Sequence, residues 1–396
     1  MILPVRLRSA LVRRLLPLYV AAFFQGFVLW YAVEKLFMTG IGFDEAGIGL
    51  MIAIYSAVMI LVETPSGILA DRWSRKGVLI LASLALIASS LVAGWSQSMP
   101  VFLISSALWG VYFALYSGTY DSIMYDTLLE ESGHTKDFDR YFGRVRTVDS
   151  VALVLSSLAG GALANAFGLR TPYFVTAVLM LLSVVALVLF REPKLHKAEA
   201  PEPVFTQVSK TFAAVLRRRT VLPVMVMSIL LSIMLYMLLE FSQVWLIELG
   251  TPTAIFGVVN AVILTSLGLG GLLAGWRQLG QGSLLTLVAA GLVICAFVMS
   301  LWQELAPVVA SQVVFCTLIV AGSVVFTRLL HDQLPSSVRA GASSAVNTMS
   351  RLVIIPLALL FGWISREASV FQAAYLLVGF AAIAGGLILW RFVGRK

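Results

Sequence analysis

Charged residues, cysteine and histidine are all scarce in this chain. Of its 396 residues only 12% are charged, about half of the roughly 25% that is typical of soluble domains. The two cysteines, Cys295 and Cys316, lie inside apolar runs and cannot build a disulfide framework or a Cys-x-x-Cys metal site. The three histidines are remote from one another and from both cysteines, so no zinc centre is expected. This composition excludes a cytosolic enzyme, a secreted domain and a disordered protein.

Apolar residues are abundant instead: they make up 60% of the chain, and the mean hydropathy is +0.95. A helix that crosses a bilayer needs about 20 mainly apolar residues. Twelve such segments are expected, at 15–38, 46–70, 77–96, 100–127, 142–167, 171–190, 221–247, 253–276, 282–301, 306–330, 342–366 and 370–390. The sequence therefore predicts an all-α membrane protein with twelve transmembrane helices.

The net charge of +8 is distributed along the ends of the apolar segments rather than gathered on one face, so a nucleic-acid partner is not expected. If both termini are cytoplasmic, 24 of the 28 Lys and Arg residues face the cytoplasm. The exceptions are Lys35, Arg170 and Arg366 on the other side and Arg351 inside a span. This asymmetry predicts a multi-pass protein of the cell inner membrane, surrounded by lipid, with both termini cytoplasmic. The segment 15–38 is too long for a signal peptide and is expected to remain as the first span.

One long polar segment, 191–220, separates six spans from six. Its first part is rich in Pro, Glu, Lys and Ala and is expected to be a solvated linker. Its second part has apolar residues at helical spacing from Phe205 to Leu216, followed by Arg217 to Arg219. This pattern fits an amphipathic helix on the inner leaflet, or an inward extension of the next span. The expected organisation is an N-terminal six-helix bundle (1–190), a cytoplasmic linker (191–220) and a C-terminal six-helix bundle (221–396).

The loop after the second span carries the most specific motif in the chain. It reads Gly67-Ile-Leu-Ala-Asp71-Arg72-Trp-Ser74-Arg75-Lys76. This resembles the Gly-x-Leu-Ala-Asp-Arg-x-Gly/Ser-Arg-Lys/Arg signature of the major facilitator superfamily, with Ser74 where glycine is commoner. The twelve spans and the basic central loop extend the resemblance over the whole chain. It implies the major facilitator fold, with two six-helix bundles that alternate access to a central site.

The resemblance also implies a role for this loop as a conformational latch that holds the outward-facing state. In the family its second arginine commonly meets an acid at the inner end of the fourth span, which corresponds here to Arg75 and Asp126. A glycine at the second span allows two helices to approach closely, and an aspartate at the membrane boundary can cap a neighbouring helix. The expected latch residues are Gly67, Asp71, Arg72, Arg75, Lys76 and Asp126. The alternative is that the basic residues only anchor the topology.

Two family elements are incomplete. The fourth span lacks the arginine that many proton-driven members carry before a glycine pair. The fifth span keeps Gly160 and Gly161 of the antiporter Gly-Pro-x-x-Gly-Gly element, with Ser156 and Ser157 in place of Gly-Pro. Both departures weaken an assignment as antiporter without excluding it.

Two corresponding spans carry aromatic residues and a carboxylate at helical spacing. They are Phe27, Trp30, Tyr31 and Glu34 in the first span, and Ile233, Tyr236, Met237, Glu240 and Gln243 in the seventh. If these faces line a central cavity, they suit a lipophilic cation through cation–π and ionic contacts, and a carboxylate there could carry the coupling proton. The alternative is that they are packing faces, with the acids reaching the outer interface.

Further charges lie within other spans, where they are costly and favour function. Asp121 and Asp149 on the fourth and fifth spans are expected to form an ion-pair network with Arg146, or alternatively a proton relay. Arg351 in the eleventh span pairs across the bundle or meets an anionic substrate.

These features together predict a secondary active transporter, and a proton gradient is the expected driving force because titratable acids lie inside the spans. Proton-coupled efflux of a lipophilic drug-like compound or metabolite is the first hypothesis. The alternatives are proton-coupled uptake of a nutrient such as a sugar or organic acid, and a non-transporting receptor or scaffold. Because no Gly-x-x-x-x-Gly-Lys-Ser/Thr loop is present, ATP is not expected as the direct energy source. No catalytic motif of an enzyme is found, and a monomer without cofactors is expected.

Overall fold

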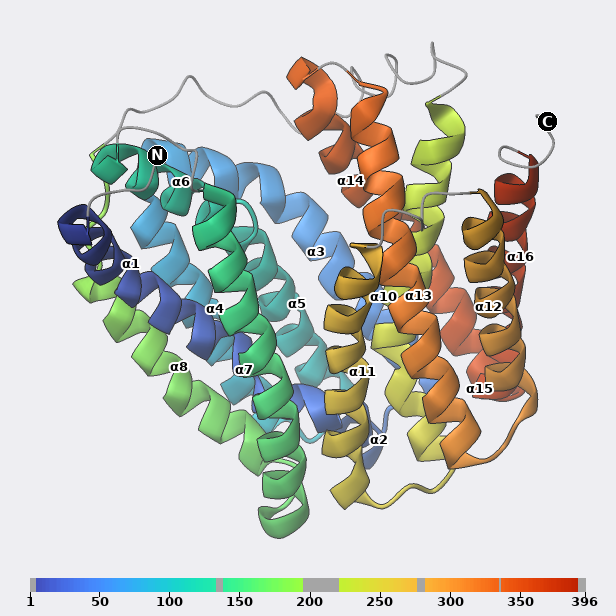
Figure 1. Cartoon of the computed structure of the whole chain (residues 1–396). Coiled ribbons are helices and arrows are strands. Elements are labelled where there is room, and N and C mark those ends of the chain that lie inside the picture. Colours follow the sequence, from blue (N-terminus) through green and yellow to red (C-terminus); the bar gives the residue numbers. More distant parts are fainter. Residues whose placement is uncertain (1–4, 133–137, 195–220, 276–281, 335, 391–396) are drawn as a thin grey trace. The chain divides into compact units, whose positions relative to one another are not determined.

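The computed structural model describes residues 5–132, 138–194, 221–275, 282–334 and 336–390, and all regular elements within these ranges are helical (Figure 1). Twelve helical spans are long and apolar enough to cross a membrane, and each coincides with one of the predicted segments. The all-α fold with twelve spans is therefore confirmed. The amphipathic helix expected within 205–219 lies outside the described residues.

The helices of the first half are α1 (Val5–Gly26), the 3-10 helix η1 (Leu29–Val33), α2 (Glu34–Gly40), α3 (Glu45–Arg72), α4 (Arg75–Trp95), α5 (Met99–Tyr116), α6 (Thr119–Ser132), α7 (Phe138–Phe167) and α8 (Thr171–Leu189). Those of the second half are α10 (Leu222–Glu248), α11 (Thr253–Ala274), α12 (Gly282–Leu301), α13 (Leu305–Asp332), α14 (Ser336–Glu367), α15 (Val370–Ala373) and α16 (Tyr375–Ile388).

Two of the predicted spans are interrupted within their length, and the twelfth is divided near its start, at Ala374, into α15 and α16. The first consists of α1, η1 and α2, because the chain leaves the α-helix after Gly26. The fourth consists of α5 and α6, joined at Ser117 and Gly118. Gly118 has φ +74°, a conformation that costs glycine little and other residues more. Hydropathy predicts only the length of an apolar run, so neither interruption could be seen in it.

The chain divides into two compact units. The N-terminal unit comprises Met1–Phe37 and Ala57–Pro201, and the C-terminal unit comprises Met38–Ser56 and Glu202–Lys396. The first part of α3 thus belongs to the C-terminal unit. Glycines bring it close to α14: a Cβ at Gly49 would strike the carbonyl of Ala358, and one at Gly362 would strike the carbonyl of Glu45.

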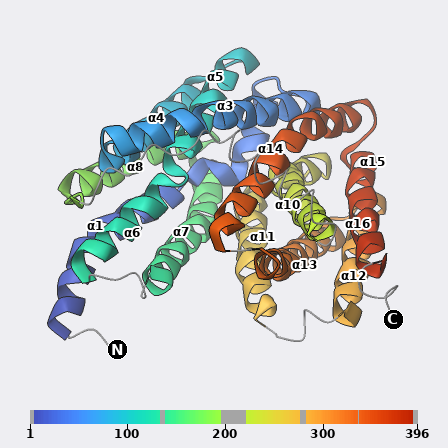
Figure 2. The ribbon, with the colours of Figure 1, turned by 90° about the horizontal axis from the view of Figure 1, so that it is seen from above.

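In the N-terminal unit α1 packs against α6, α7 and α8, and α4 packs against α5 and α8 (Figure 1). The inner part of this packing is an apolar cluster around Leu15, Leu18, Ile123 and Leu187, all of which are 0–1% exposed. In the C-terminal unit α10 lies among α13, α14 and α16 (Figure 2). Its Trp245 is fully buried and donates a hydrogen bond from Nε1 to the carbonyl of Met299 at 3.0 Å.

Candidate functional site

The motif loop between α3 and α4 is built around the first turn of α4. Ser74 is the N-cap of α4, and its Oγ accepts a hydrogen bond from the N–H of Gly77 at 2.8 Å. Serine is among the best N-cap residues because its oxygen satisfies a backbone donor that the helix leaves open. The departure from glycine at this position therefore stabilises the start of α4.

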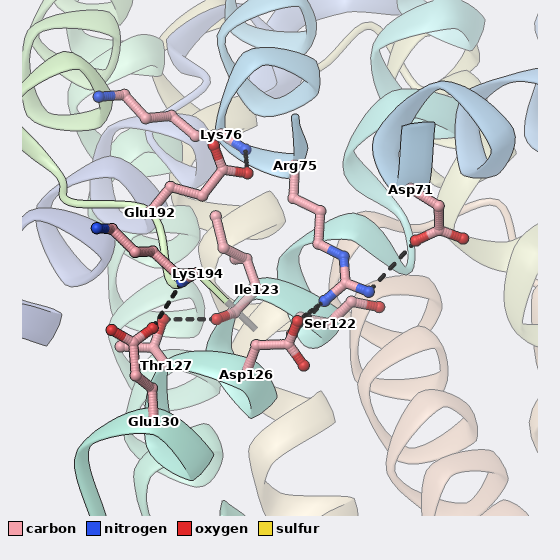
Figure 3. Close-up of polar contacts among 10 residues, drawn as sticks. All are labelled: Asp71, Arg75, Lys76, Ser122, Ile123, Asp126, Thr127, Glu130, Glu192 and Lys194. Atoms are coloured by element: carbon pink, nitrogen blue, oxygen red, sulfur yellow. Dashed lines mark hydrogen bonds and ion pairs between the residues drawn. The ribbon is translucent and has the colours of Figure 1, made fainter. Parts of the chain in front are cut away.

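Glu192, just after α8, contributes a carboxylate to the same helix terminus (Figure 3). Its Oε2 accepts a hydrogen bond from the Ser74 hydroxyl at 2.7 Å, and its Oε1 accepts one from the N–H of Lys76 at 3.1 Å. A negative charge is favourable at a helix N-terminus. The sequence carries no signal for this contact, because Glu192 lies 116 residues after Lys76 in a segment whose composition predicts only a linker.

Arg75 connects two carboxylates of the N-terminal unit (Figure 3). Its Nη1 contacts Asp126 on α6, and its Nη2 lies 3.3 Å from Oδ1 of Asp71, one turn earlier in the chain. Nη1 also donates to the carbonyl of Ser122 at 3.3 Å. The three charged side chains are only 17–19% exposed. The structure thus places Arg75 on the acid that the family resemblance implies, and the latch function itself stays a prediction.

Other motif residues differ from the expectations. Lys76 binds backbone rather than carboxylates: its Nζ donates to the carbonyls of Val188 and Phe190, at 2.7 and 2.9 Å, at the end of α8. Ser74 and Glu192 occupy the N-terminus of α4, and the helix-capping role expected of Asp71 stays a prediction. A Cβ at Gly67 would meet nothing within 4 Å, so no described helix of the N-terminal unit packs closely against this glycine. Arg72 is exposed.

Glu34 and Lys35 form a buried ion pair at the start of α2. The Nζ of Lys35 lies 2.5 Å from Oε2 of Glu34, and the residues are 1% and 6% exposed. Both side chains are thus enclosed by protein, and their positions relative to the membrane stay predictions. Charge counts along a sequence treat each Lys as solvated, whereas a carboxylate partner allows this ammonium to lie in the protein interior.

The aromatic stripe expected on the first span does not form, because it presumes one continuous helix. Trp30 is 3% exposed, its Nε1 donates to Ser90 Oγ at 3.0 Å, and its ring stacks on Tyr173 at a centroid distance of 5.3 Å. It is a packing residue of the N-terminal unit. Tyr31 is partly exposed, and its ring lies 6.4 Å from that of Trp30.

Of the ion pairs expected on the fourth and fifth spans, the structure shows the one between Arg146 and Asp121, whereas Asp149 makes no ion pair within the described residues. Nη2 of Arg146 on α7 lies 3.6 Å from Oδ1 of Asp121 on α6, with both side chains about half exposed. Asp149 lies one turn after Arg146 and faces the interruption of the first span. A role of Asp121 or Asp149 in transport stays a prediction.

On α10, in the C-terminal unit, the predicted stripe divides into two kinds of residue. Ile233 and Met237 are 1–2% exposed and pack in the core, whereas Tyr236 and Glu240 are partly exposed. The hydroxyl of Tyr55 on α3 donates a hydrogen bond to Oε1 of Glu240 at 2.8 Å.

Arg351 lies partly buried on α14, and its expected role stays a prediction.

A cavity of about 220 Å³, lined by polar and apolar side chains, lies between α10, α13 and α14 within the C-terminal unit. Its polar lining consists of Ser228, Ser232, Ser323, Thr327, Ser343 and Asn347. Ser343 Oγ also lies 2.9 Å from Nε2 of His331. Hydroxyl and amide groups can both donate and accept hydrogen bonds, so this wall suits an uncharged polar group. Hydroxyls spread over three helices leave no sequence pattern that predicts it.

The fold agrees with a comparison of the chain with protein families. The model of the Major Facilitator Superfamily matches residues 15–358. The chain belongs to this superfamily. It is therefore a multi-pass membrane transporter of the major facilitator type, whose members carry small molecules.

Curated relatives of the chain include several multidrug resistance proteins. Multidrug resistance protein MdtG of Salmonella arizonae is 24% identical over 62% of this chain and 59% of its own length. Multidrug resistance protein 2 of Bacillus subtilis is 26% identical over 44% of this chain and 42% of its own length. MdtG of Escherichia fergusonii is 31% identical over 40% of this chain and 38% of its own length. The matched regions thus span less than two thirds of these relatives.

Solved structures show the same fold over almost the whole chain. The nucleoside transporter NupG superposes with a TM-score of 0.79 at 15% identity, covering 97% of this chain and 100% of its own. A bacterial homolog of the human lysosomal transporter Spinster superposes with a TM-score of 0.75, also at 15% identity, over 97% and 96% of the two chains.

Proposed function

We propose that this transporter exports a lipophilic, drug-like compound or metabolite across the inner membrane in exchange for protons. The observation that carries the proposal is Glu240, a partly exposed carboxylate within a span, held by the hydroxyl of Tyr55 and one turn from Tyr236. A carboxylate beside aromatic rings attracts lipophilic cations through ionic and cation–π contacts. The multidrug resistance proteins among its relatives support the direction and the substrate class.

Alternating access requires an element that favours one state. We assign this role to the network of Asp71, Arg75 and Asp126, with the N-terminal and C-terminal bundles moving around the central site and the segment 191–220 joining them. The transporter works as a monomer with both termini in the cytoplasm. A proton gradient drives the transport cycle, because carboxylates inside the spans can bind and release protons.

Glu240→Gln tests this proposal. The variant keeps the hydrogen bond from Tyr55 but removes the charge, so exchange of ethidium for protons should fall by about tenfold or more. The measurement uses proteoliposomes with an imposed proton gradient and reads ethidium movement and internal pH together.

Glu248→Gln is the matched control, because Glu248 ends the same helix and its carboxylate accepts the N–H of Val370 at 2.9 Å. This control should exchange ethidium for protons as the wild type does. Full coupled exchange in Glu240→Gln would contradict the role of this residue.

A second function has its own support. The cavity lined by serine, threonine and asparagine favours a polar, uncharged solute, which agrees better with proton-coupled nutrient uptake. Entry of a nucleoside or sugar with protons in the same proteoliposomes, without ethidium exchange, would establish this alternative.

A further inference from the structure

The interruption of the first span exposes backbone groups inside the N-terminal unit. Between Gly26 and Leu29 the chain is not α-helical, and side chains of other helices bind the backbone there. Thr176 Oγ1 of α8 accepts the N–H of Leu29 at 3.1 Å, and the hydroxyl of Tyr112 on α5 donates to the carbonyl of Gln25 at 3.4 Å. Irregular backbone at membrane depth persists where protein buries it or where it lines a cavity.

One face of α7 lies directly against this interruption. A Cβ at Gly26 would overlap the carboxylate of Asp149, and a Cβ at Gly160 would overlap the carbonyl of Leu29. Asp149 and Gly160 are 11 residues apart, which is about three helical turns, so they lie on the same side of α7. Gly160, a remnant of the antiporter element, lets η1 approach α7, and Gly26 makes room for the Asp149 carboxylate.

Asp149 is surrounded by one cation and several oxygen groups. Arg146 on its own helix attracts it, and the titratable groups that face it are Tyr112 and Tyr116 on α5 and Tyr120 on α6. Within the described residues its carboxylate accepts no hydrogen bond and lies in no ion-pair contact, whereas Asp121 lies 3.6 Å from Arg146. Arg146 is thus shared unequally between two carboxylates.

This arrangement disfavours a permanent charge on Asp149. One guanidinium cannot neutralise both Asp121 and Asp149, and an unbalanced charge within a span is costly. The C-terminal end of α1, which carries the negative end of the helix dipole, also lies at the Asp149 carboxylate. A neutral carboxyl group relieves both effects and gains a donor for the carbonyl oxygens of the interruption.

We infer that Asp149, placed at the interruption of the first span, is the group that binds and releases the coupling proton. The inference rests on the proposed proton exchange and names its site. A proton taken from one side of the membrane binds a carboxylate oxygen of Asp149, and the neutral group turns to the backbone at Gly26. Loss of the proton to the other side restores the charge and draws Arg146 away from Asp121. The protonation state is thereby linked to the packing of α1 against α7.

Asp149→Asn tests the inference, because it keeps the size of the side chain and removes the titration. In proteoliposomes with ethidium inside and an internal pH dye, the wild type should release ethidium in exchange for protons. In the absence of a gradient, the variant should keep the wild-type rate of ethidium counterflow. With a gradient, its proton flux should be lower than that of the wild type by a factor of at least about ten. Thr147→Ala, on the exposed side of the same helix, should behave as the wild type does.

Two further variants separate titration from packing. Asp121→Asn leaves Arg146 to Asp149 alone, so the charged form is favoured and the pH dependence of exchange should shift to more acidic pH while coupling remains. Gly26→Ala puts a methyl group where the carboxylate lies and should reduce the proton flux with Asp149 intact. Unfolding temperatures near that of the wild type would show that each variant folds.

The outcomes distinguish the two proposals. A wild type that moves ethidium without protons would overturn the proposed proton exchange and the inference with it. A wild type that exchanges protons, together with an Asp149→Asn variant that exchanges them equally well, would overturn the inference alone. Exchange driven by a sodium gradient and lost in Asp149→Asn would overturn the assignment of the proton as the ion bound there.

Discussion

Replacing Arg75 by alanine is expected to slow substrate counterflow by about tenfold, which corresponds to ~1.4 kcal/mol. The guanidinium holds Asp71 of α3 and Asp126 of α6 at the start of α4, and the two carboxylates act on each other electrostatically. Without Arg75 they repel, so the conformation that this network stabilises becomes less populated. The rate of ethidium counterflow in proteoliposomes, without an imposed gradient, measures the effect.

The control for this prediction is Arg72→Ala, in the same motif. Arg72 is exposed, so its removal should leave counterflow near the wild-type rate. Asp126→Asn should slow counterflow as Arg75→Ala does, and the double variant should be no slower than either single variant, because both changes remove the same contact. Equal losses in Arg72→Ala and Arg75→Ala would instead favour the alternative of a topological anchor, in which only the positive charge of the loop matters.

The twelve spans could be predicted because an apolar run of about 20 residues has few other uses. The seventh, for example, was expected at 221–247 and is found at Leu222–Glu248. What happens inside a run could not be predicted in the same way. The interruption after Gly26 depends on Thr176, Asp149 and other side chains far away in the sequence, and hydropathy does not register them.

Among the candidate residues, too, some contacts could be predicted from the sequence and others depend on residues far away in the chain. The contact of Arg75 with Asp126 could be expected because a motif with a known partner carries it. The contact of Glu192 with the first turn of α4 could not be expected, because a glutamate is common in a polar linker. Only the position of the end of α8 in the fold brings this carboxylate to Ser74 and Lys76. Trp30 shows the opposite error: its residue type suggests a binding surface, but the turn before it places the ring in the core.

Lys35→Met is expected to lower the free energy of unfolding by roughly 3 kcal/mol, because it removes the ammonium that contacts a buried carboxylate. Lys35 and Glu34 are 1% and 6% exposed, and their charged atoms lie 2.5 Å apart. Equilibrium unfolding in mixed detergent micelles, followed by tryptophan fluorescence, measures the loss.

The double variant Glu34→Gln with Lys35→Met separates the pair from its surroundings. It leaves no uncompensated carboxylate, and replacing a whole buried pair by neutral groups costs far less than breaking it. The double variant should therefore be more stable than Lys35→Met alone. Arg366→Met is the exposed control: its ion pairs with Asp44 and Glu367 lie at the surface, where water and salt screen such pairs and their contribution to stability is small. If Lys35→Met were no less stable than Arg366→Met, the buried pair would be unimportant for the stability of the fold. A role in transport would then have to explain why two charged side chains lie buried at the start of α2.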